Sequence, residues 1–246
     1  MSALLEVQGL TKRFGGLTAV KDVSFALDKG EITGILGPNG AGKTTLFNLL
    51  TAFILPDSGT IAFDGDSIRG LAPYRIVNRG LARTFQLCRP FVGMSAQENV
   101  MVGCLGAGKH GSETAGTRAL ELLVMVGLNR KAHMPSEVLS YGDLRRLEIA
   151  RALATNPKLL LLDEPFAGLG TGEIAPLSEL IRKLHQEQGL TILIIEHKLR
   201  EFMRLVKRVI AMDFGEIIAA GDPEQIVRDP RVIEAYIGRE EEHAPA

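Results

Sequence analysis

Residues 37–45 constrain the fold of this chain more than any other stretch, because they match the pattern G-x-x-x-x-G-K-[ST]. The short apolar run 31–36 precedes them and is typical of a buried strand, and Leu46 to Leu50 follow with helical spacing. The loop therefore joins a strand to a helix N-terminus, where unpaired backbone N–H groups and the helix dipole attract phosphate. A glycine-rich turn that matches by chance is the alternative, and the flanking strand and helix argue against it.

This loop predicts a binding site for a nucleoside triphosphate. Its glycines let the main chain approach the anion without a Cβ in the way. We expect Lys43 to reach the β- and γ-phosphates and the Thr44 hydroxyl to hold Mg²⁺. The residues expected to line the nucleotide are Gly37, Pro38, Asn39, Gly40, Ala41, Gly42, Lys43, Thr44 and Thr45.

Composition limits the size of the fold and the class of partner. A chain of 246 residues that is 46% hydrophobic can bury one substantial core, with at most a small appended lobe. The net charge of -1 gives no sign of bulk nucleic-acid binding, and Cys88 and Cys104 are expected to be reduced cytosolic thiols. The N-terminus has no signal-peptide pattern, and no apolar stretch approaches the roughly 18 residues of a membrane span. We therefore expect a soluble protein that docks on a membrane component.

Apolar runs predict an α/β fold with a β-rich N-terminal lobe beside the nucleotide core. The runs 159–162 and 191–195 are continuously apolar and fit strands buried on both faces of a parallel sheet. A crossover helix between them is expected to bury Ile174, Leu177, Ile181 and Leu184. The remaining expected strands are 5–7, 23–27, 31–36, 60–63, 209–212 and 216–220, followed by two short helices and a polar tail from Glu240.

The region from about 87 to 154 is expected to form an inserted helical subdomain. Residues 106–118 are rich in Gly, Ser and Thr and predict a mobile loop. Two helical stripes follow, and ordinary core packing explains both. The stripes are Leu120, Leu123, Val124 and Leu128, then Leu144, Leu147, Ala150 and Ala154.

Two carboxylates, Asp163 and Glu164, follow the apolar run 159–162. Strand C-termini line the ligand crevice of a doubly wound sheet, so Asp163 is expected beside Mg²⁺. Glu164 lies one residue further, where a base can polarise the attacking water. A solvated acidic turn would explain a lone Asp-Glu, but the phosphate loop makes the catalytic interpretation stronger.

Leu139-Ser140-Tyr141-Gly142-Asp143 opens a predicted helix shortly before Asp163, with Ser140 as N-cap. With the phosphate loop and the carboxylates, this stretch resembles the ATP-binding subunits of ABC transporters, whose signature is Leu-Ser-Gly-Gly-Gln. The resemblance implies an ABC-type P-loop domain with a RecA-like core, an N-terminal antiparallel β lobe and an inserted helical subdomain. It also implies that two subunits meet head to tail, so that Ser140 and Gly142 contact the ATP of the partner.

The same resemblance implies roles for three further residues. His197 follows the strand 191–195 and looks like the switch histidine that contacts the γ-phosphate. Gln86 resembles the loop glutamine that senses Mg²⁺ and water and faces the membrane subunits. Phe14 occupies the place of the aromatic residue that stacks on adenine, with core packing as an open alternative. The implied organisation is one domain over 1–246, with 1–86 and 155–246 as core and β lobe and about 87–154 as the helical signature subdomain.

Four short stretches narrow the resemblance to the branched-chain amino acid importer ATPases. They are 14–20, 83–86, 140–142 and 195–197, and the ending 232–238 fits as well. Related ABC systems for urea or amide import and for lipopolysaccharide export share some of these sequence motifs. The implied cofactors are ATP and Mg²⁺. The implied partners are integral membrane permeases, a second ATP-binding subunit (similar or identical) and, indirectly, an extracytoplasmic solute-binding protein, with the chain peripheral on the inner face of the cell membrane.

The sequence departs from the subfamily pattern at three places. Asp143 and Leu144 replace the usual glutamines, Gly170 and Thr171 replace Asn or Asp and Pro, and Lys198 replaces Asp. None removes a group expected to touch phosphate, so we expect them to affect communication between sites.

Two functions of other classes compete with transport. A soluble ABC ATPase acting on DNA needs a long coiled-coil insertion, and the ribosomal type usually has two tandem nucleotide domains. This chain shows neither, which excludes nucleic acid as the expected partner. A regulatory module that does not hydrolyse ATP is disfavoured because Glu164, Gln86 and His197 are all present.

Overall fold

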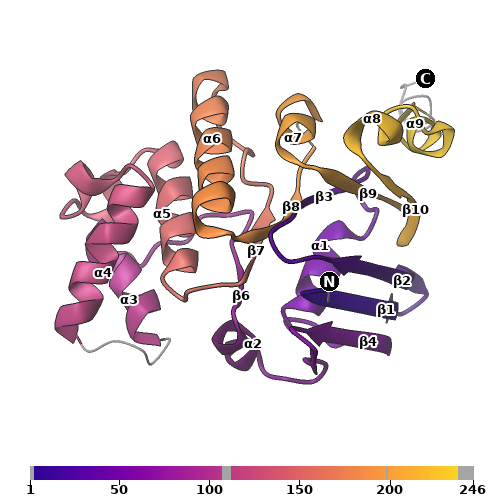
Figure 1. Cartoon of the computed structure of the whole chain (residues 1–246), viewed down its shortest axis with the longest axis horizontal. Coiled ribbons are helices and arrows are strands. Elements are labelled where there is room, and N and C mark those ends of the chain that lie inside the picture. Colours follow the sequence, from indigo (N-terminus) through magenta and orange to yellow (C-terminus); the bar gives the residue numbers. More distant parts are fainter. Residues whose placement is uncertain (1–2, 107–111, 198, 238–246) are drawn as a thin grey trace. The chain divides into compact units, whose positions relative to one another are not determined.

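The computed structural model describes residues 3–106, 112–197 and 199–237 and divides the chain into two compact units (Figure 1). The first unit combines Met1–Pro73 with Thr191–Ala246, and the second is Tyr74–Leu190. The predicted helical region, about 87–154, lies within the second unit.

A sheet of mostly parallel strands forms the centre of the first unit. Strand β3 (Ile32–Leu36) lies between β8 (Thr191–Ile195) and β9 (Arg208–Asp213), parallel to both, and β10 (Glu216–Gly221) pairs antiparallel with β9. Every residue of β3 and β8 is buried, as their apolar runs predict.

Helices cover both faces of this sheet. Helix α1 (Lys43–Leu50) lies on one side and α7 (Leu199–Leu205) on the other (Figure 1). Helix α7 packs so closely that a Cβ on Gly34 would lie 2.1 Å from Cζ of Phe202. The two predicted C-terminal helices are α8 (Pro223–Ile226) and α9 (Pro230–Ile237), and the polar tail from Glu240 lies outside the described residues.

The predicted antiparallel lobe is also present in the first unit. Its strand order is β2-β1-β4-β5, with β1 (Leu5–Phe14), β2 (Leu17–Leu27), β4 (Ser58–Phe63) and β5 (Asp66–Ser67). The first two strands are longer than the predicted 5–7 and 23–27. Register shifts along β1 break the strict alternation of side chains, so that periodicity underestimates their length.

The second unit contains two short parallel strands and most of the helices. The strands are β6 (Leu81–Arg83) and β7 (Leu159–Asp163). Helix α3 packs against both α4 and α5, as Figure 1 shows. The helices are α2 (Pro73–Arg79, which begins at the boundary), α3 (Ala96–Gly106), α4 (Ser112–Met125), α5 (Tyr141–Leu153), α6 (Thr171–Gln188) and the 3-10 turns η1 (Asn129–Lys131) and η2 (Ser136–Val138).

One prediction for this region was wrong and another was wrong in part. The expected loop 106–118 is helical from Ser112 onward, because Ala115 and Ala119 provide a small-residue face that is fully buried; residues 107–111 lie outside the described part. The first predicted stripe is half right: Leu123 and Leu128 are buried as expected, whereas Leu120 and Val124 are exposed at 38% and 62%. The buried face of α4 is instead Ala115, Ala119, Leu122 and Leu123.

The other two helical predictions are confirmed. In α5, Leu147 and Ala150 are buried and Leu144 is half-buried, and Ala154, the residue that caps its C-terminus, is also buried. In α6, Leu177, Ile181 and Leu184 are buried, with Ile174 half-buried.

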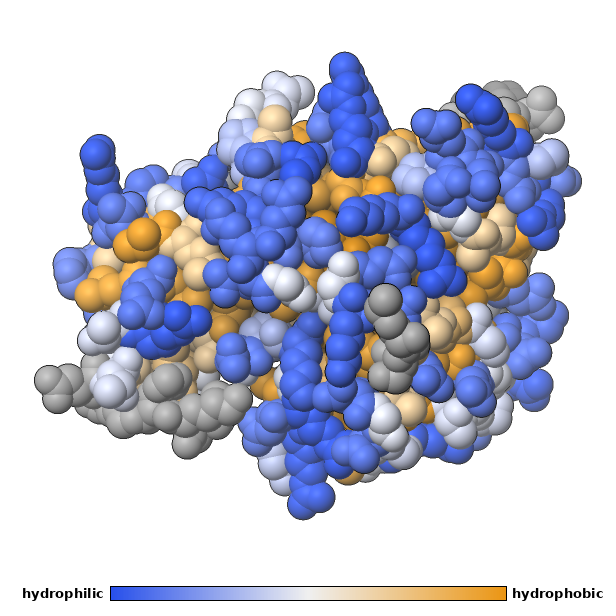
Figure 2. All heavy atoms as spheres, viewed as in Figure 1, coloured by the Kyte–Doolittle hydropathy of each residue, from blue (hydrophilic) through white to orange (hydrophobic). Residues whose placement is uncertain are grey.

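Figure 2 shows a face on which hydrophilic side chains predominate and hydrophobic ones occur in small groups. Within the ranges that the structure describes, no helix has the length and apolar character needed to cross a membrane.

Candidate functional site

The phosphate loop leaves β3 and ends at α1, as the sequence predicts. At two positions of the loop, Gly37 and Gly42, the backbone of another segment lies too close to leave room for a Cβ. A Cβ on Gly37 would lie 2.2 Å from the carbonyl oxygen of Met212, and one on Gly42 would lie 2.2 Å from that of Ala19. Gly42 also has φ +96 at the N-cap of α1, a conformation that glycine adopts without strain. The loop thus keeps its backbone amides at the start of a helix, where phosphate is attracted.

Lys43 lies across this loop with its side chain largely buried. Its Nζ donates to the carbonyl oxygens of Gly37 at 2.6 Å and Pro38 at 2.9 Å. The ammonium is therefore held in the concave side of the loop where anion oxygens are expected. Thr44, the next residue, is exposed and leaves its hydroxyl accessible at the first turn of α1.

His197 leaves the same sheet edge as the phosphate loop. Strands β3 and β8 are parallel, with Ile35 opposite Ile195, so the residues after both strands emerge at one edge. His197 is exposed, and its backbone N–H donates to Oε2 of the fully buried Glu196 at 3.0 Å. Lys198, the third departure, lies outside the described residues.

Phe14 lies at the end of β1 and is not part of the core. Its side chain is 45% exposed, which contradicts the core-packing alternative. The Nζ of Lys12 lies 5.6 Å from the ring centroid. An exposed ring of this kind can accept a stacked base, and adenine stacking stays a prediction.

In the second unit, β6 and β7 place Asp163 and Gln86 at a shared edge. The strands are parallel with Arg83 opposite Leu161, so the chain leaves both strands in one direction. Asp163 is buried and paired with Arg83, whose Nη2 lies 2.6 Å from Oδ2. No role for Arg83 was predicted from the sequence, because its partner Asp163 is distant along the chain. The one feature of the sequence that could have indicated a role for Arg83 is a basic residue at the end of a short apolar strand.

Gln86 and Glu164 are in direct contact. The Nε2 of Gln86 donates to Oε2 of Glu164 at 2.7 Å. Glu164 is 9% exposed and has φ +47, which is unusual for a residue with a Cβ. Such backbone strain is concentrated at functional sites. The two side chains that were expected to handle the attacking water are thus brought together.

Ser140 caps α5 and is exposed. Its Oγ accepts from the backbone N–H of Asp143 at 3.2 Å, and Oδ2 of Asp143 accepts from the Ser140 N–H at 3.3 Å, which is a capping box. Asp143 also forms an ion pair with Lys131. A Cβ on Gly142 would lie 2.3 Å from Oε1 of Glu173, so no larger residue fits there without movement.

These residues fit a nucleotide with its magnesium ion. The phosphate loop offers helix-start amides, the Lys43 ammonium and the Thr44 hydroxyl. In the described part of the chain no three His, Cys, Asp or Glu side chains are clustered to hold a metal by themselves. The Thr44 hydroxyl and the Asp163 carboxylate are oxygen ligands of the kind that Mg²⁺ accepts, alongside phosphate oxygens and water.

Comparisons with known proteins agree with this arrangement. Residues 20–167 match the family described as ABC transporter, and 216–242 match the one described as branched-chain amino acid ATP-binding cassette transporter. The chain is 41% identical to BraF of Pseudomonas aeruginosa, a high-affinity branched-chain amino acid transport ATP-binding protein, over 96% of this chain and 98% of that protein.

Two solved structures are similar over most of their length. The ADP conformation of MJ1267, an ATP-binding cassette of an ABC transporter, has a TM-score of 0.87 and 32% identity, covering 97% of this chain and 100% of that one. The dimeric cassette MJ0796 bound to ADP and Pi has a TM-score of 0.80 and 28% identity, covering 89% and 98%. The predicted ABC-type fold is confirmed. The chain belongs to the ATP-binding proteins of ABC transporters, and it is an ATPase.

Proposed function

We propose that this chain is the motor subunit of an importer for branched-chain or related amino acids. The observation that carries this proposal is the near full-length similarity to BraF together with the separate match of 216–242. That second segment covers β10, α8 and α9 and lies outside the phosphate loop and the carboxylates, so it is independent of general ATP binding.

In this proposal two ATP-binding subunits pair head to tail and hold two ATP molecules between them. Lys43 and the loop amides bind the phosphates, and Ser140 and Gly142 of each subunit contact the nucleotide of the other. When bound, Mg²⁺ neutralises charge that develops on the phosphoryl oxygens, and Thr44, Asp163 and Gln86 are the residues that would hold it.

The remaining site residues act on the water and the γ-phosphate. Glu164 accepts the proton of the attacking water, and its hydrogen bond with Gln86 supports a shared role in orienting that water. His197 contacts the γ-phosphate, and Phe14 stacks on adenine.

Coupling to transport requires partners in the membrane. Integral membrane permease subunits hold the chain on the inner face of the cell membrane, and an extracytoplasmic solute-binding protein acts indirectly through them. The whole chain, 1–246, is one ABC domain in this proposal, with about 87–154 as the helical signature subdomain.

The test is solute-stimulated ATP hydrolysis by the assembled transporter in vesicles. A binding protein loaded with leucine, isoleucine or valine should raise the ATPase rate several-fold over the same vesicles without solute. The complex carrying Lys43→Ala is the matched control for contaminating ATPase. Stimulation by urea or amides alone, or by lipopolysaccharide alone, would assign the chain to one of the related systems.

A further inference from the structure

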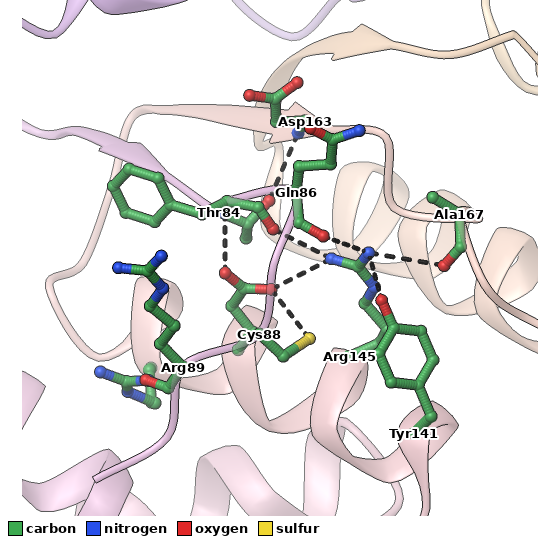
Figure 3. Close-up of polar contacts among 11 residues, drawn as sticks. Thr84, Gln86, Cys88, Arg89, Tyr141, Arg145, Asp163 and Ala167 are labelled. Carbon is green, nitrogen blue, oxygen red and sulfur yellow. Dashed lines mark hydrogen bonds and ion pairs between the residues drawn. The ribbon is translucent and has the colours of Figure 1, made fainter.

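One buried arginine on α5 contacts three segments of the second unit. Arg145 is 2% exposed and lies in the second turn of the helix that Ser140 caps. Figure 3 shows its guanidinium at the centre of a polar cluster, with Gln86, Tyr141 and Ala167 around it.

The guanidinium holds the main chain of the loop that carries Gln86. Its Nη1 donates to the carbonyl oxygen of Phe85 at 2.9 Å, and its Nη2 donates to that of Gln86 at 2.6 Å. A rigid fork of donors on two successive carbonyls fixes the orientation of the peptide between them, which a lysine cannot do. The side chain of that same Gln86 reaches Glu164.

Glu148, one turn further along α5, binds a backbone N–H group of the loop that carries Gln86. Its Oε1 accepts from the backbone N–H of Phe85 at 2.7 Å, and its Oε2 accepts from Sγ of Cys88 at 3.4 Å. Oε2 also lies 3.5 Å from Nη1 of Arg145. Both backbone polar groups of Phe85 are therefore bonded to α5.

Tyr141 connects this arginine to the signature loop. Its hydroxyl accepts from Nη2 of Arg145 at 2.8 Å, and the guanidinium carbon lies 5.1 Å from the ring centroid. The ring also packs against the loop that follows Glu164. A Cβ on Gly168 would lie 2.7 Å from Cε1 of Tyr141, and the carbonyl oxygen of Ala167 is 3.4 Å from Nη2 of Arg145.

We propose that Tyr141 and Arg145 form a positioning pair that couples the signature loop to Gln86. Ser140 and Tyr141 are adjacent, so nucleotide docking at Ser140 displaces the phenol to which Arg145 is bonded, and Arg145 carries that displacement to the Gln86 peptide. The proposal rests on the proposed function for one point, the assignment of Ser140 as the contact with the partner's ATP. It gives the tyrosine a task that the glycine of Leu-Ser-Gly-Gly-Gln cannot perform.

A buried cluster that only stabilises the fold would respond differently to mutation. Its loss lowers the melting temperature and leaves the rate per folded molecule unchanged. A positioning pair changes kcat at constant nucleotide affinity, and its effect depends on the residue that it positions.

The first experiment measures the order of the Gln86 loop in the full chain without nucleotide. The sequence contains no tryptophan, and Leu87 is 64% exposed, so Leu87→Trp places a single fluorophore beside Gln86. Adding Arg145→Met should speed the local anisotropy decay several-fold, and adding Tyr141→Phe should speed it less. The matched control is Arg146→Met, the next residue on α5, which should leave the decay unchanged. A decay that Arg145→Met does not alter would overturn the proposal.

The second experiment uses Tyr141→Phe in the assembled transporter, because this variant keeps the ring against Gly168 and removes one oxygen atom. We expect kcat for ATP hydrolysis to fall about tenfold, with KM for ATP within about twofold and the melting temperature unchanged. In a Gln86→Ala background the same change should cost less than about twofold, since the positioned group is gone. Fully additive losses would overturn the coupling.

Failure of the proposed function gives a different result. If the wild-type chain did not bind ATP, or if its transporter did not hydrolyse ATP, the proposal that the chain is a motor subunit would be wrong. The anisotropy of the Leu87→Trp chain needs no nucleotide and would still report whether Arg145 orders the loop.

Discussion

The charge of Lys43 is expected to contribute to nucleotide binding. Its ammonium already faces the concave side of the phosphate loop, where it bonds to the carbonyl oxygens of Gly37 and Pro38. Lys43→Ala removes the cation that phosphate oxygens would meet, so ATP affinity should fall at least about tenfold, or about 1.4 kcal/mol. Equilibrium titration measures this, with the exposed Lys29→Ala as control. Equal affinity in the two variants would contradict the assignment of the loop.

Asp143 shows what a departure from the family pattern does locally. Burial opposes its ionisation, but hydrogen bonds from Lys131 and Ser140 and the Lys131 charge hold its pKa below the ordinary value of 3.8. Because the folded-state pKa is lowered, ionised Asp143 stabilises the fold above about pH 4. That stabilisation is lost as the pH falls through the folded-state pKa.

Asp143→Ala should therefore lower the free energy of unfolding by about 1 kcal/mol at pH 7, mainly through loss of the capping box. The difference from wild type should shrink as the pH falls below 4, which urea unfolding at several pH values can measure. A difference that stays constant down to pH 2 would show that the charge of Asp143 contributes nothing.

Substitution of Asp143 is expected to leave the rate of ATP hydrolysis almost unchanged. The charge of Asp143 is paired with Lys131 and lies at the positive start of α5, and both offset the negative charge close to Ser140. Asp143→Gln should change the ATPase rate of the assembled transporter by less than about threefold, or roughly 0.7 kcal/mol. A tenfold rise would mean that the signature of this chain is degenerate.

At the scale of elements, α9 brings the C-terminal part of the first unit against the phosphate loop. Burial raises the pKa of Tyr236 to about 12, with Asp213 adding to the shift and the Gly37 backbone amide opposing it. The buried hydroxyl makes no well-formed hydrogen bond to any residue that the structure describes. A buried hydroxyl without a good partner costs free energy in the folded state.

Tyr236→Phe should consequently leave the free energy of unfolding unchanged or raise it by up to about 1 kcal/mol. Tyr236→Ala is the contrasting variant and should lower it by about 3 kcal/mol, because a cavity forms beside Gly37. Both values come from urea unfolding of the full chain. Destabilisation of more than about 1 kcal/mol by Tyr236→Phe would show that the hydroxyl is satisfied in solution.

Helices, strands and loops could be predicted from the sequence where a single hydrophobic pattern or a motif of fixed spacing extended over the whole element. Strands β7 and β8 are continuous apolar runs, and the phosphate loop is defined by residue types at fixed spacing. Strand β6 has three residues, too few for any periodicity, and the buried face of α4 begins with alanines that resemble loop composition.

The same limit applies to the site. Lys43, Asp163, Glu164 and His197 were proposed from the sequence because each lies at or after the end of a recognisable strand, and their roles stay predictions. Arg83 and Arg145 could not, because their partners are distant along the chain: Arg83 pairs with a residue 80 positions away. Such contacts depend on tertiary packing, which local pattern does not encode.

At the scale of the whole molecule, the residues proposed to act in hydrolysis come from both units. The first carries the phosphate loop and His197, and the second carries Asp163, Glu164 and Gln86. Ser140 is exposed at the start of α5 and is the residue proposed to contact the partner's nucleotide.

Glu164→Gln separates assembly from hydrolysis. The amide keeps the size of the side chain and can still accept from Gln86, but it cannot take a proton, so hydrolysis should slow by about 10²–10⁴-fold while ATP binds normally. With Mg²⁺ and ATP, a dimer should accumulate on a sizing column, either of this chain alone or only with its second ATP-binding subunit. Adding Ser140→Arg should abolish that dimer without weakening ATP binding, because the large cation obstructs the signature contact. Turnover by Glu164→Gln at the wild-type rate would place the catalytic base on another residue.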